Sequence, residues 1–223
     1  MVIYTRIIKP IAFRFDPEKT HNIALNLGIF LGKFWLTRFI LKLVYSYSDN
    51  RLKTEFLGVN FENPVGLAAG FDKNGVLTNI LPCIGFGFLE IGSVTARKCE
   101  GNPKPRLWRL PKDNSIAVNY GLCNDGATKI AERLKIKSSI PLFISIAKTN
   151  DPTIKGDDSV EDYYRSFQIL RNLGYPIVLN ISCPNSGDGR TFEDSVLLNK
   201  LLQRIRIKKE KVFIKISSEL DKK

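Results

Sequence analysis

The stretch IVLNISCPNS, residues 177–186, joins a β-branched apolar run to a cluster of small polar side chains. The apolar run predicts a buried strand, and Pro184 ends it because proline cannot continue a strand's hydrogen bonding. Asn180, Cys183 and Asn185 then lie at or just past the carboxyl end of that strand. Because α/β barrels build their active sites at this end of their strands, the stretch predicts both a fold class and a site.

Apolar strand-like runs alternate with helix-like segments on both sides of this stretch. The runs cover residues 64–69, 88–93, 141–147, 177–182 and 212–217. The helix-like segments cover residues 75–84, 125–136, 160–173 and 195–207. Such alternation is typical of a parallel sheet covered by helices. Residues 94–117 do not fit it, since they are rich in proline and charge, and we expect an insertion with short strands of its own that folds over the site.

A complete (β/α)8 TIM barrel needs eight strands and about 250 residues. Five strand-like runs occur in residues 55–223, so two arrangements fit the pattern. One is an open five-stranded sheet, and the other is a chain that stops partway through a barrel. In either case we expect two parts: an N-terminal helical segment, residues 1–53, and an α/β part, residues 54–223.

The first 53 residues are basic and apolar. They contain nine Lys and Arg against three Asp and Glu, in a chain with a formal net charge of +12. Asp16, Pro17 and Glu18 predict a helix start, with an N-cap, a proline at the first helical position and an acid in the first turn. A basic apolar segment indicates an anionic membrane surface as partner. Nucleic acid is the rival explanation of the charge, but no motif for binding it is present.

Residues 27–45 are strongly apolar, but Lys33, Arg38 and Lys42 interrupt them. Three charges near its centre would be costly in a helix that crosses a membrane. We therefore expect a helix that lies in the headgroup region of a membrane. A helix packed against the rest of the domain is the alternative.

The four cysteines, Cys83, Cys99, Cys123 and Cys183, are scattered and form no CxxC pair. Since His21 is the single histidine, we expect no zinc or other metal site. Scattered single cysteines are typical of a reducing cytoplasm. The first residues lack the pattern of a cleavable signal sequence, so we expect none.

Three further segments place small or polar residues where strands end. GLAAGFDKNG, residues 66–75, would let a flat ligand approach the backbone and sets Asp72 and Lys73 beside it. LEIGSVT, residues 89–95, offers hydroxyls and backbone N–H groups. NYGLCNDG, residues 119–126, offers amides that donate and accept, which suits a heterocycle with imide edges. Ordinary turns and a capped helix start are the competing explanations of these segments.

Two single side chains are also candidates for a functional role. Cys183 can be a base, a nucleophile or a small core residue, since free cysteine is most often buried and inert. Its place past a strand end, among amides, favours a functional role. Lys215 ends the last strand-like run, and a lysine pointing into a barrel mouth needs a partner. A ligand anion or an electron-rich ring would serve as that partner.

Four motifs in order resemble those of dihydroorotate dehydrogenases, in particular the membrane-associated, quinone-linked class 2. They are DPEKTH (residues 16–21), NPVGLAAGFDK (63–73), KPRLWRL (104–110) and NISCPN (180–185). The resemblance implies an FMN-dependent TIM barrel that oxidises dihydroorotate to orotate in pyrimidine (UMP) synthesis. It also implies quinone as acceptor and a peripheral position on the cytoplasmic side of the cell membrane. The family's last three strands, with the flavin phosphate site, have no counterpart here.

The resemblance also implies residue roles. Cys183 would be the base that removes the C5 proton while the C6 hydride passes to the flavin, and Lys73 would contact the orotate carboxylate. The residues implied to hold the pyrimidine ring are Asn119, Asn124, Asn180, Asn185 and Ser186. The residues implied to line the flavin are Ala69, Gly70, Ser93, Ser145, Asn180 and Lys215.

Three positions depart from the class 2 pattern. Class 2 has serine where Cys183 stands, and cysteine is the class 1 pattern. Residues 121–124 also look like class 1, with a one-residue gap that leaves the register of Asn119 open. Ser145 stands where class 2 has asparagine on the flavin. The N-terminal segment thus predicts quinone as acceptor, while the site mixes the two classes.

Two other functions fit parts of the sequence. A flavin-dependent dihydrouridine synthase would use a cysteine acid on a similar barrel, and the basic charge would then bind tRNA. A non-catalytic remnant of the barrel would lack the phosphate site and expose an unpaired strand edge. Salt-dependent tRNA binding would favour the first, and weak flavin binding would favour the second.

Overall fold

A computed structural model describes residues 4–183, 191–207 and 210–217. The described part is built around a five-stranded sheet in which every neighbouring pair is parallel. In sheet order the strands are β3 (Gly66–Leu67), β4 (Phe88–Val94), β7 (Leu142–Ile146), β8 (Ile177–Asn180) and β9 (Val212–Lys215). Each of the five predicted strand-like runs overlaps one of these strands, and β4 extends one residue beyond its run, to Val94. The sheet is therefore a partial α/β barrel wall, as predicted.

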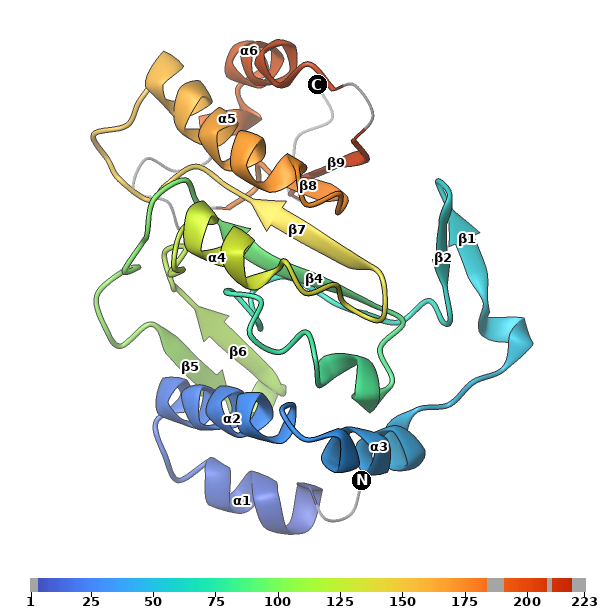
Figure 1. The fold of residues 1–223 in the computed structure, drawn as a ribbon. Helices are drawn as coiled ribbons and strands as arrows, with labels where there is room; N and C mark the ends of the chain where they lie inside the picture. Colours follow the sequence, from blue (N-terminus) through green and yellow to red (C-terminus); the bar gives the residue numbers. More distant parts are fainter. Residues whose placement is uncertain (1–3, 184–190, 208–209, 218–223) are drawn as a thin grey trace.

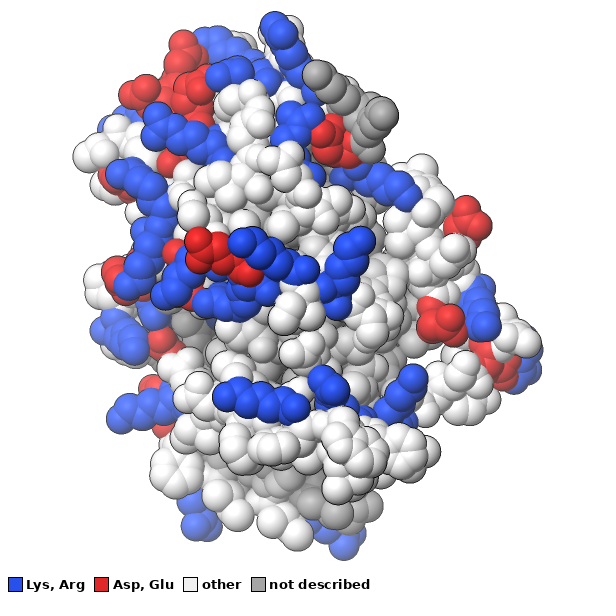
Figure 2. Space-filling view, viewed as in Figure 1, with Lys and Arg blue, Asp and Glu red and all other residues white. Residues whose placement is uncertain are grey.

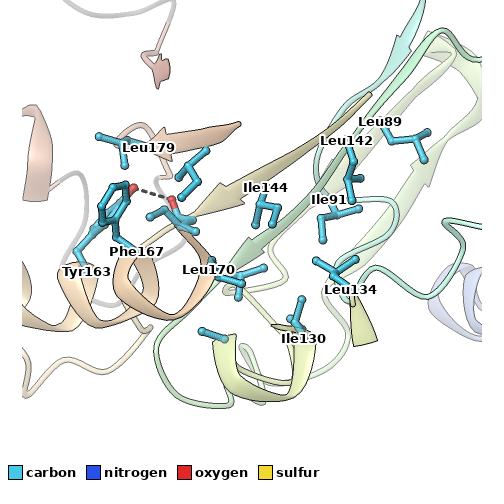
Figure 3. Packing of buried hydrophobic residues seen from close by; sticks show 14 of the residues in the cluster. Leu89, Ile91, Ile130, Leu134, Leu142, Ile144, Tyr163, Phe167, Leu170 and Leu179 are labelled. Carbon is cyan, nitrogen blue, oxygen red and sulfur yellow. Dashed lines mark hydrogen bonds between the residues drawn. The ribbon is translucent and has the colours of Figure 1, made fainter. Parts of the chain in front are cut away.

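Three helices cover one face of this sheet: α4 (Ala127–Arg133), α5 (Asp157–Arg171) and α6 (Ser195–Ile205) (Figure 1). Alternate strand residues point toward them, because successive side chains of a strand face opposite sides. Ile144 of β7 is fully buried against this layer. Figure 3 shows the resulting core, in which the Tyr163 hydroxyl donates to the carbonyl oxygen of Ile146 at 2.6 Å.

The opposite face of the sheet carries aromatic side chains at the amino ends of the strands. Phe143 of β7 lies with its ring centroid 5.7 Å from Phe88 and 5.5 Å from Phe213. Phe61 joins them from β2 (Val59–Phe61), which pairs with β1 (Thr54–Phe56) in a hairpin. The hairpin lies at the amino ends of the strands in Figure 1. These rings therefore close the end of the sheet that lies away from the predicted site.

The N-terminal segment forms α1 (Lys9–Ala12), α2 (Pro17–Leu31) and α3 (Trp35–Tyr45). Asp16 caps α2, as predicted, by accepting a hydrogen bond from the backbone N–H of Lys19 at 2.8 Å. The apolar stretch 27–45 is divided between α2 and α3. In the described part of the chain no helix is both long and apolar enough to span a bilayer.

The predicted insertion forms a hairpin of β5 (Leu107–Leu110) and β6 (Ser115–Val118). In Figure 1 it lies between α2 and the sheet. Arg109 donates a hydrogen bond to the carbonyl oxygen of Phe15 at 2.8 Å, just before α2 begins. The insertion therefore ties the N-terminal helices to the sheet.

The prediction of a helix over residues 75–84 was wrong. This segment forms turns and one short 3-10 helix, Leu81–Ile84. Gly75 takes a left-handed backbone conformation with φ of 63°, and Pro82 has no N–H to donate. The Asp72 carboxylate instead accepts the N–H groups of Val76 at 2.9 Å and Leu77 at 2.8 Å. Apolar spacing alone did not reveal these interruptions.

Single turns complete the described elements. They are a π-helical turn at Tyr4–Ile8 and 3-10 turns at Asn50–Leu52, Pro111–Asp113 and Thr191–Glu193.

Candidate active site

A cavity of about 500 Å³ opens at the carboxyl ends of the strands, a size within the range of small-molecule sites. Seven of the predicted site residues line it: Ala69, Gly70, Lys73, Ser93, Asn180, Cys183 and Lys215. They come from four strand ends that lie far apart in the sequence. The parallel sheet brings them together, because parallel strands have their carboxyl ends on the same edge.

Strand register explains why the polar groups share one face. Asn180 and Lys215 are directly paired across β8 and β9, and Val178 pairs with Phe213 two residues earlier. Since side chains two residues apart point the same way, Asn180 and Lys215 share the face that carries Phe213. Aromatic rings therefore occupy this face at the amino ends of the strands, and polar groups follow at the carboxyl ends.

A hydrogen-bonded chain fixes the amide at the end of β8. Asn180 donates from Nδ2 to Ser93 Oγ at 2.8 Å, and Ser93 Oγ lies 2.9 Å from Ser145 Oγ. The backbone N–H and hydroxyl of Ser182 donate to Asn180 Oδ1 at 3.3 and 3.1 Å. Ser145 is fully buried and does not line the cavity. In this structure Ser145 therefore holds the Ser93 hydroxyl and does not itself reach the surface predicted to bind the flavin.

Lys215 reaches the cavity from β9 beside the carboxylate of Glu90. Its Nζ lies 3.4 Å from both Glu90 oxygens, and the backbone N–H of Ala69 donates to Glu90 Oε2 at 3.4 Å. These contacts are long, and two-fifths of the Lys215 side chain stays exposed. The lysine can therefore still meet a ligand in the cavity.

The end of β3 presents backbone to the cavity, as its small residues predicted. Gly70 has φ of 109° and its N–H donates to the carbonyl oxygen of Gly92 at 2.9 Å. A Cβ at Gly70 would meet no atom within 4 Å, so its open side faces space that a ligand can use. A Cβ at Gly92 would lie 2.5 Å from the carbonyl oxygen of Ser145, so no larger residue fits there.

Asp72 lies beneath this surface, in contrast to the expectation that it lies beside the ligand. The side chain is buried and accepts backbone N–H groups of the turn that follows. Burial raises the pKa of this carboxyl, while the backbone N–H groups oppose that rise. Asp72 therefore shapes the turn that presents Lys73.

Lys73 lies half-buried at the cavity wall, and its Nζ is 3.9 Å from the ring centroid of Tyr120. Burial lowers the pKa of Lys73, with Arg106 adding to that effect and the Cys123 thiol opposing it. His21 of α2 also lines the cavity, with its ring 5.0 Å from Phe71 in an edge contact. Burial and the nearby Lys73 charge lower the pKa of His21.

Two predicted amides do not line the cavity. Asn124 is buried, and its amide binds the backbone N–H and the hydroxyl of Thr95 and the carbonyl of Leu122. Asn119 is exposed, and its Oδ1 accepts from Asn102 Nδ2 at 2.7 Å. The neighbouring residue, Tyr120, lines the cavity instead.

Cys183 lines the cavity just past β8 and remains a free thiol. Asn185 and Ser186, the two remaining predicted ring contacts, lie outside the described residues. A second thiol, Cys123, also lines the cavity, and it accepts from the Arg106 guanidinium at 3.6 Å. Among the residues that the structure describes, no group of three His, Cys, Asp or Glu side chains could hold a metal ion.

The sequence did not single out several residues of the cavity wall. They are His21, the hairpin residues Leu107, Ile116 and Val118, and Tyr120. The apolar alternation of the hairpin strands was a usable signal, since Ile116 and Val118 are two residues apart and face the same way. His21 lies inside the DPEKTH motif, but its position over the cavity depends on how α2 packs.

A parallel α/β wall, with a largely apolar cavity that a few polar groups enter at the strand ends, defines part of a ligand-binding barrel. The family model for dihydroorotate dehydrogenase matches residues 51–223, so the chain belongs to the dihydroorotate dehydrogenase family. Proteins named dihydroorotate dehydrogenase (quinone) are similar to it. Those of Nostoc punctiforme and Christiangramia forsetii are each 37% identical, over 99% and 98% of this chain.

Two solved structures that resemble this chain are dihydroorotate dehydrogenases. A ligand-free dihydroorotate dehydrogenase from Eimeria tenella matches with a TM-score of 0.78 at 26% identity, over 93% of this chain and 63% of that one. The same enzyme in complex with ferulenol matches with a TM-score of 0.70. The chain spans 62% and 65% of the length of the two curated relatives above.

Proposed function

We propose that this protein is an FMN-dependent dihydroorotate dehydrogenase that passes electrons to quinone. The observation that carries the proposal is the convergence of Lys73, Asn180, Cys183 and Lys215 on one cavity. Orotate is planar and anionic, with carbonyl and N–H groups around its ring. A lysine and an amide match that chemistry, and a missing partner would leave a costly unpaired group.

The cavity fits the flat isoalloxazine ring of FMN. Small residues and open backbone at Ala69 and Gly70 allow close approach, while Ser93, Asn180 and Lys215 offer polar contacts at the same wall. When bound, FMN supplies the acceptor for a hydride. The residues of this chain then need only to bind, orient and deprotonate the substrate.

Lys73 would pair with the substrate carboxylate, and Asn180 would hold the ring. The amide of Asn180 is already oriented by Ser93 and Ser182, so little freedom is lost on binding. Cys183 would remove the C5 proton, and its place at the cavity wall supports that role.

Quinone would approach from the side of the N-terminal helices. His21 of α2 and the apolar side chains of Leu107 and Val118 line that part of the cavity. An apolar wall suits the ring and tail of a quinone, so these contacts support the N-terminal side as its route.

The N-terminal helices would attach the protein to the cytoplasmic side of the cell membrane. Trp35 is 70% exposed and Leu43 69% exposed, and Lys33, Arg38 and Lys42 lie in the same segment. Figure 2 shows Lys and Arg side chains on a largely uncharged surface over these helices. Apolar side chains with basic neighbours are what an interfacial helix presents to anionic lipid.

Flavin titration and turnover test the proposal together. We expect the 223-residue chain to quench the fluorescence of added FMN, and the complex to form orotate from dihydroorotate with a soluble quinone. Absence of FMN binding and of orotate binding would contradict the proposed function. Salt-dependent binding of tRNA with no orotate formation would favour a dihydrouridine synthase instead.

A further inference from the structure

We propose that Tyr120 is a positioning residue for Lys73, whose ammonium it holds at the cavity wall for an anionic ligand. The Lys73 Nζ lies 3.9 Å from the Tyr120 ring centroid, well within cation–π range. In the described part of the chain Lys73 makes no hydrogen bond or ion pair that would compete with this contact. The identity of the ligand as orotate rests on the proposed function, whereas the contact does not.

The Tyr120 ring is itself held by its surroundings. Its backbone carbonyl accepts the N–H of Asn102 at 3.0 Å, and the Cζ of Arg106 lies 5.0 Å from the ring centroid. Arg106 is immobilised by bonds from Nη2 and Nε to the Glu18 carboxylate, at 2.8 and 3.2 Å. The ring is therefore a fixed support, and α2 contributes to its position through Glu18.

The hydroxyl of Tyr120 takes no part in this support. It is buried and has no hydrogen-bond partner among the residues that the structure describes, and burial raises its pKa to about 12. A buried donor without a partner is unfavourable, so removing this oxygen costs no interaction. The π face carries the function, and phenylalanine would preserve it.

The position of Tyr120 also differs from the site expected from the sequence, in which Asn119 reaches the ligand. The amide of Asn119 is bound to Asn102 outside the cavity, and Tyr120 occupies the wall in its place. An aromatic ring cannot replace an amide as a ring-edge partner. It can restrict a long flexible lysine, which otherwise loses side-chain entropy when it pairs with an anion.

Orotate affinity measured by calorimetry tests the role of the ring. Tyr120→Leu removes the ring and should weaken orotate binding roughly 2- to 30-fold, the range expected for a cation–π contact. Tyr120→Phe keeps the ring and should retain the wild-type affinity within about twofold. In a Lys73→Met background the Leu substitution should have no further effect, because the two residues act as one unit. Equal losses with and without Lys73 would overturn the inference.

A second readout needs neither flavin nor orotate. In protein carrying 13C-labelled lysine, the Lys73 Cε signal, assigned by its loss in Lys73→Arg, should show an upfield ring-current shift. The shift should persist in Tyr120→Phe and disappear in Tyr120→Leu, or in Tyr120→Met if the Leu variant does not fold. If the wild-type chain binds no orotate, the proposed function fails and this shift alone decides the inference. An unshifted wild-type signal would overturn it.

Discussion

At the residue scale, Lys73 and Lys215 reach one cavity with different neighbours. Lys215 lies near the Glu90 carboxylate, while Lys73 lies on an aromatic ring and close to Arg106. Burial lowers the pKa of Lys73, so an anion that pairs with it would reverse part of that effect. Lys73 is thus the better placed of the two to receive a carboxylate.

Replacing Lys73 by methionine keeps the side-chain length and removes the charge. We expect orotate affinity to fall about 10- to 100-fold, the loss of a charge-assisted hydrogen bond of about 1.5–3 kcal/mol. Titration calorimetry measures the change. Lys104→Met is the matched control, since Lys104 is exposed and outside the cavity, and it should bind orotate normally. Equal affinity of both variants would contradict the role of Lys73.

In the proposed function Cys183 removes the C5 proton. Cys183→Ala should lower turnover by about 10²- to 10⁴-fold, the contribution of a general base. Cys183→Ser should keep part of the activity and require higher pH, because a hydroxyl ionises less readily than a thiol. Turnover against pH, with orotate affinity as a control for folding, separates the two variants. A fully active alanine variant would show that another group removes the proton.

At the element scale, α2 and the β5–β6 hairpin depend on a buried ion pair. The side chains of Glu18 and Arg106 are 9% and 7% exposed, with Arg106 Nη2 2.8 Å from Glu18 Oε1. Hydrogen bonding to Arg106 is the main cause that lowers the pKa of Glu18. The pKa of Glu18 is lower in the folded state than in the unfolded chain. The pair therefore contributes its full stability above the unfolded pKa of Glu18, and this stability is lost as the pH falls through the folded pKa.

Glu18→Gln should therefore destabilise the protein by about 3 kcal/mol at pH 7, because it leaves Arg106 buried without a charge partner. The difference from wild type should begin to shrink once the pH falls below about 4.5, where Glu18 of the unfolded chain takes up a proton while the folded state resists protonation until lower pH. Urea denaturation at pH 7 and pH 4 measures both values. Glu161→Gln is the control, because its pair with Arg204 is exposed and should contribute little. A pH-independent difference would contradict the electrostatic explanation.

The aromatic side chains on one face of the sheet should also contribute to the stability of the protein. Phe143 contacts Phe61, Phe88 and Phe213 on the face that lies opposite the helices. Phe143→Ala should cost about 1–3 kcal/mol of unfolding free energy, since it removes a half-buried ring and its contacts with three neighbouring rings. Thermal unfolding followed by circular dichroism measures the loss. Phe56→Ala, at an exposed position of the same group, should cost much less.

At the scale of the whole molecule, charge and apolar surface coincide over the N-terminal helices. The chain has a formal net charge of +12, and nine of its basic residues fall in the first 53 positions. Trp35, Phe39 and Leu43 are more than half exposed on α3. Such a surface has a favourable partner in an anionic membrane.

Trp35→Ser combined with Phe39→Ser should reduce binding to vesicles of phosphatidylglycerol and phosphatidylcholine. A loss of about 2–4 kcal/mol follows from the two buried side chains, which is roughly 30- to 1,000-fold in affinity. Sedimentation with vesicles measures the affinity, and added salt should weaken the binding of the wild-type protein. Ile136→Ser is the control, because Ile136 is also strongly exposed, at 72%, but is not part of the N-terminal helices. Equal binding of all variants would contradict membrane attachment through α3.

The local patterns predicted the five sheet strands and most of the cavity wall. Strand ends such as Asn180–Cys183 and Gly66–Gly70 were readable because apolar runs stop abruptly at small polar residues. The helix predicted over residues 75–84 was wrong, because the helical spacing of apolar residues does not reveal that the Asp72 carboxylate binds the turn. The β1–β2 hairpin was missed because the first position of its two-residue turn is Leu57, with φ of 51°, where asparagine, aspartate or glycine is common.

The parallel sheet, the order of its elements and the set of polar residues at strand ends could be read from local sequence patterns. These follow from periodicity and from residue chemistry, which act over a few positions. Which of these residues meet depends on the fold. Strand register pairs Asn180 with Lys215, the Asn102 amide binds Asn119 outside the cavity, and the Tyr120 ring lies against Lys73. Such contacts depend on the three-dimensional arrangement of distant segments, which no local pattern encodes.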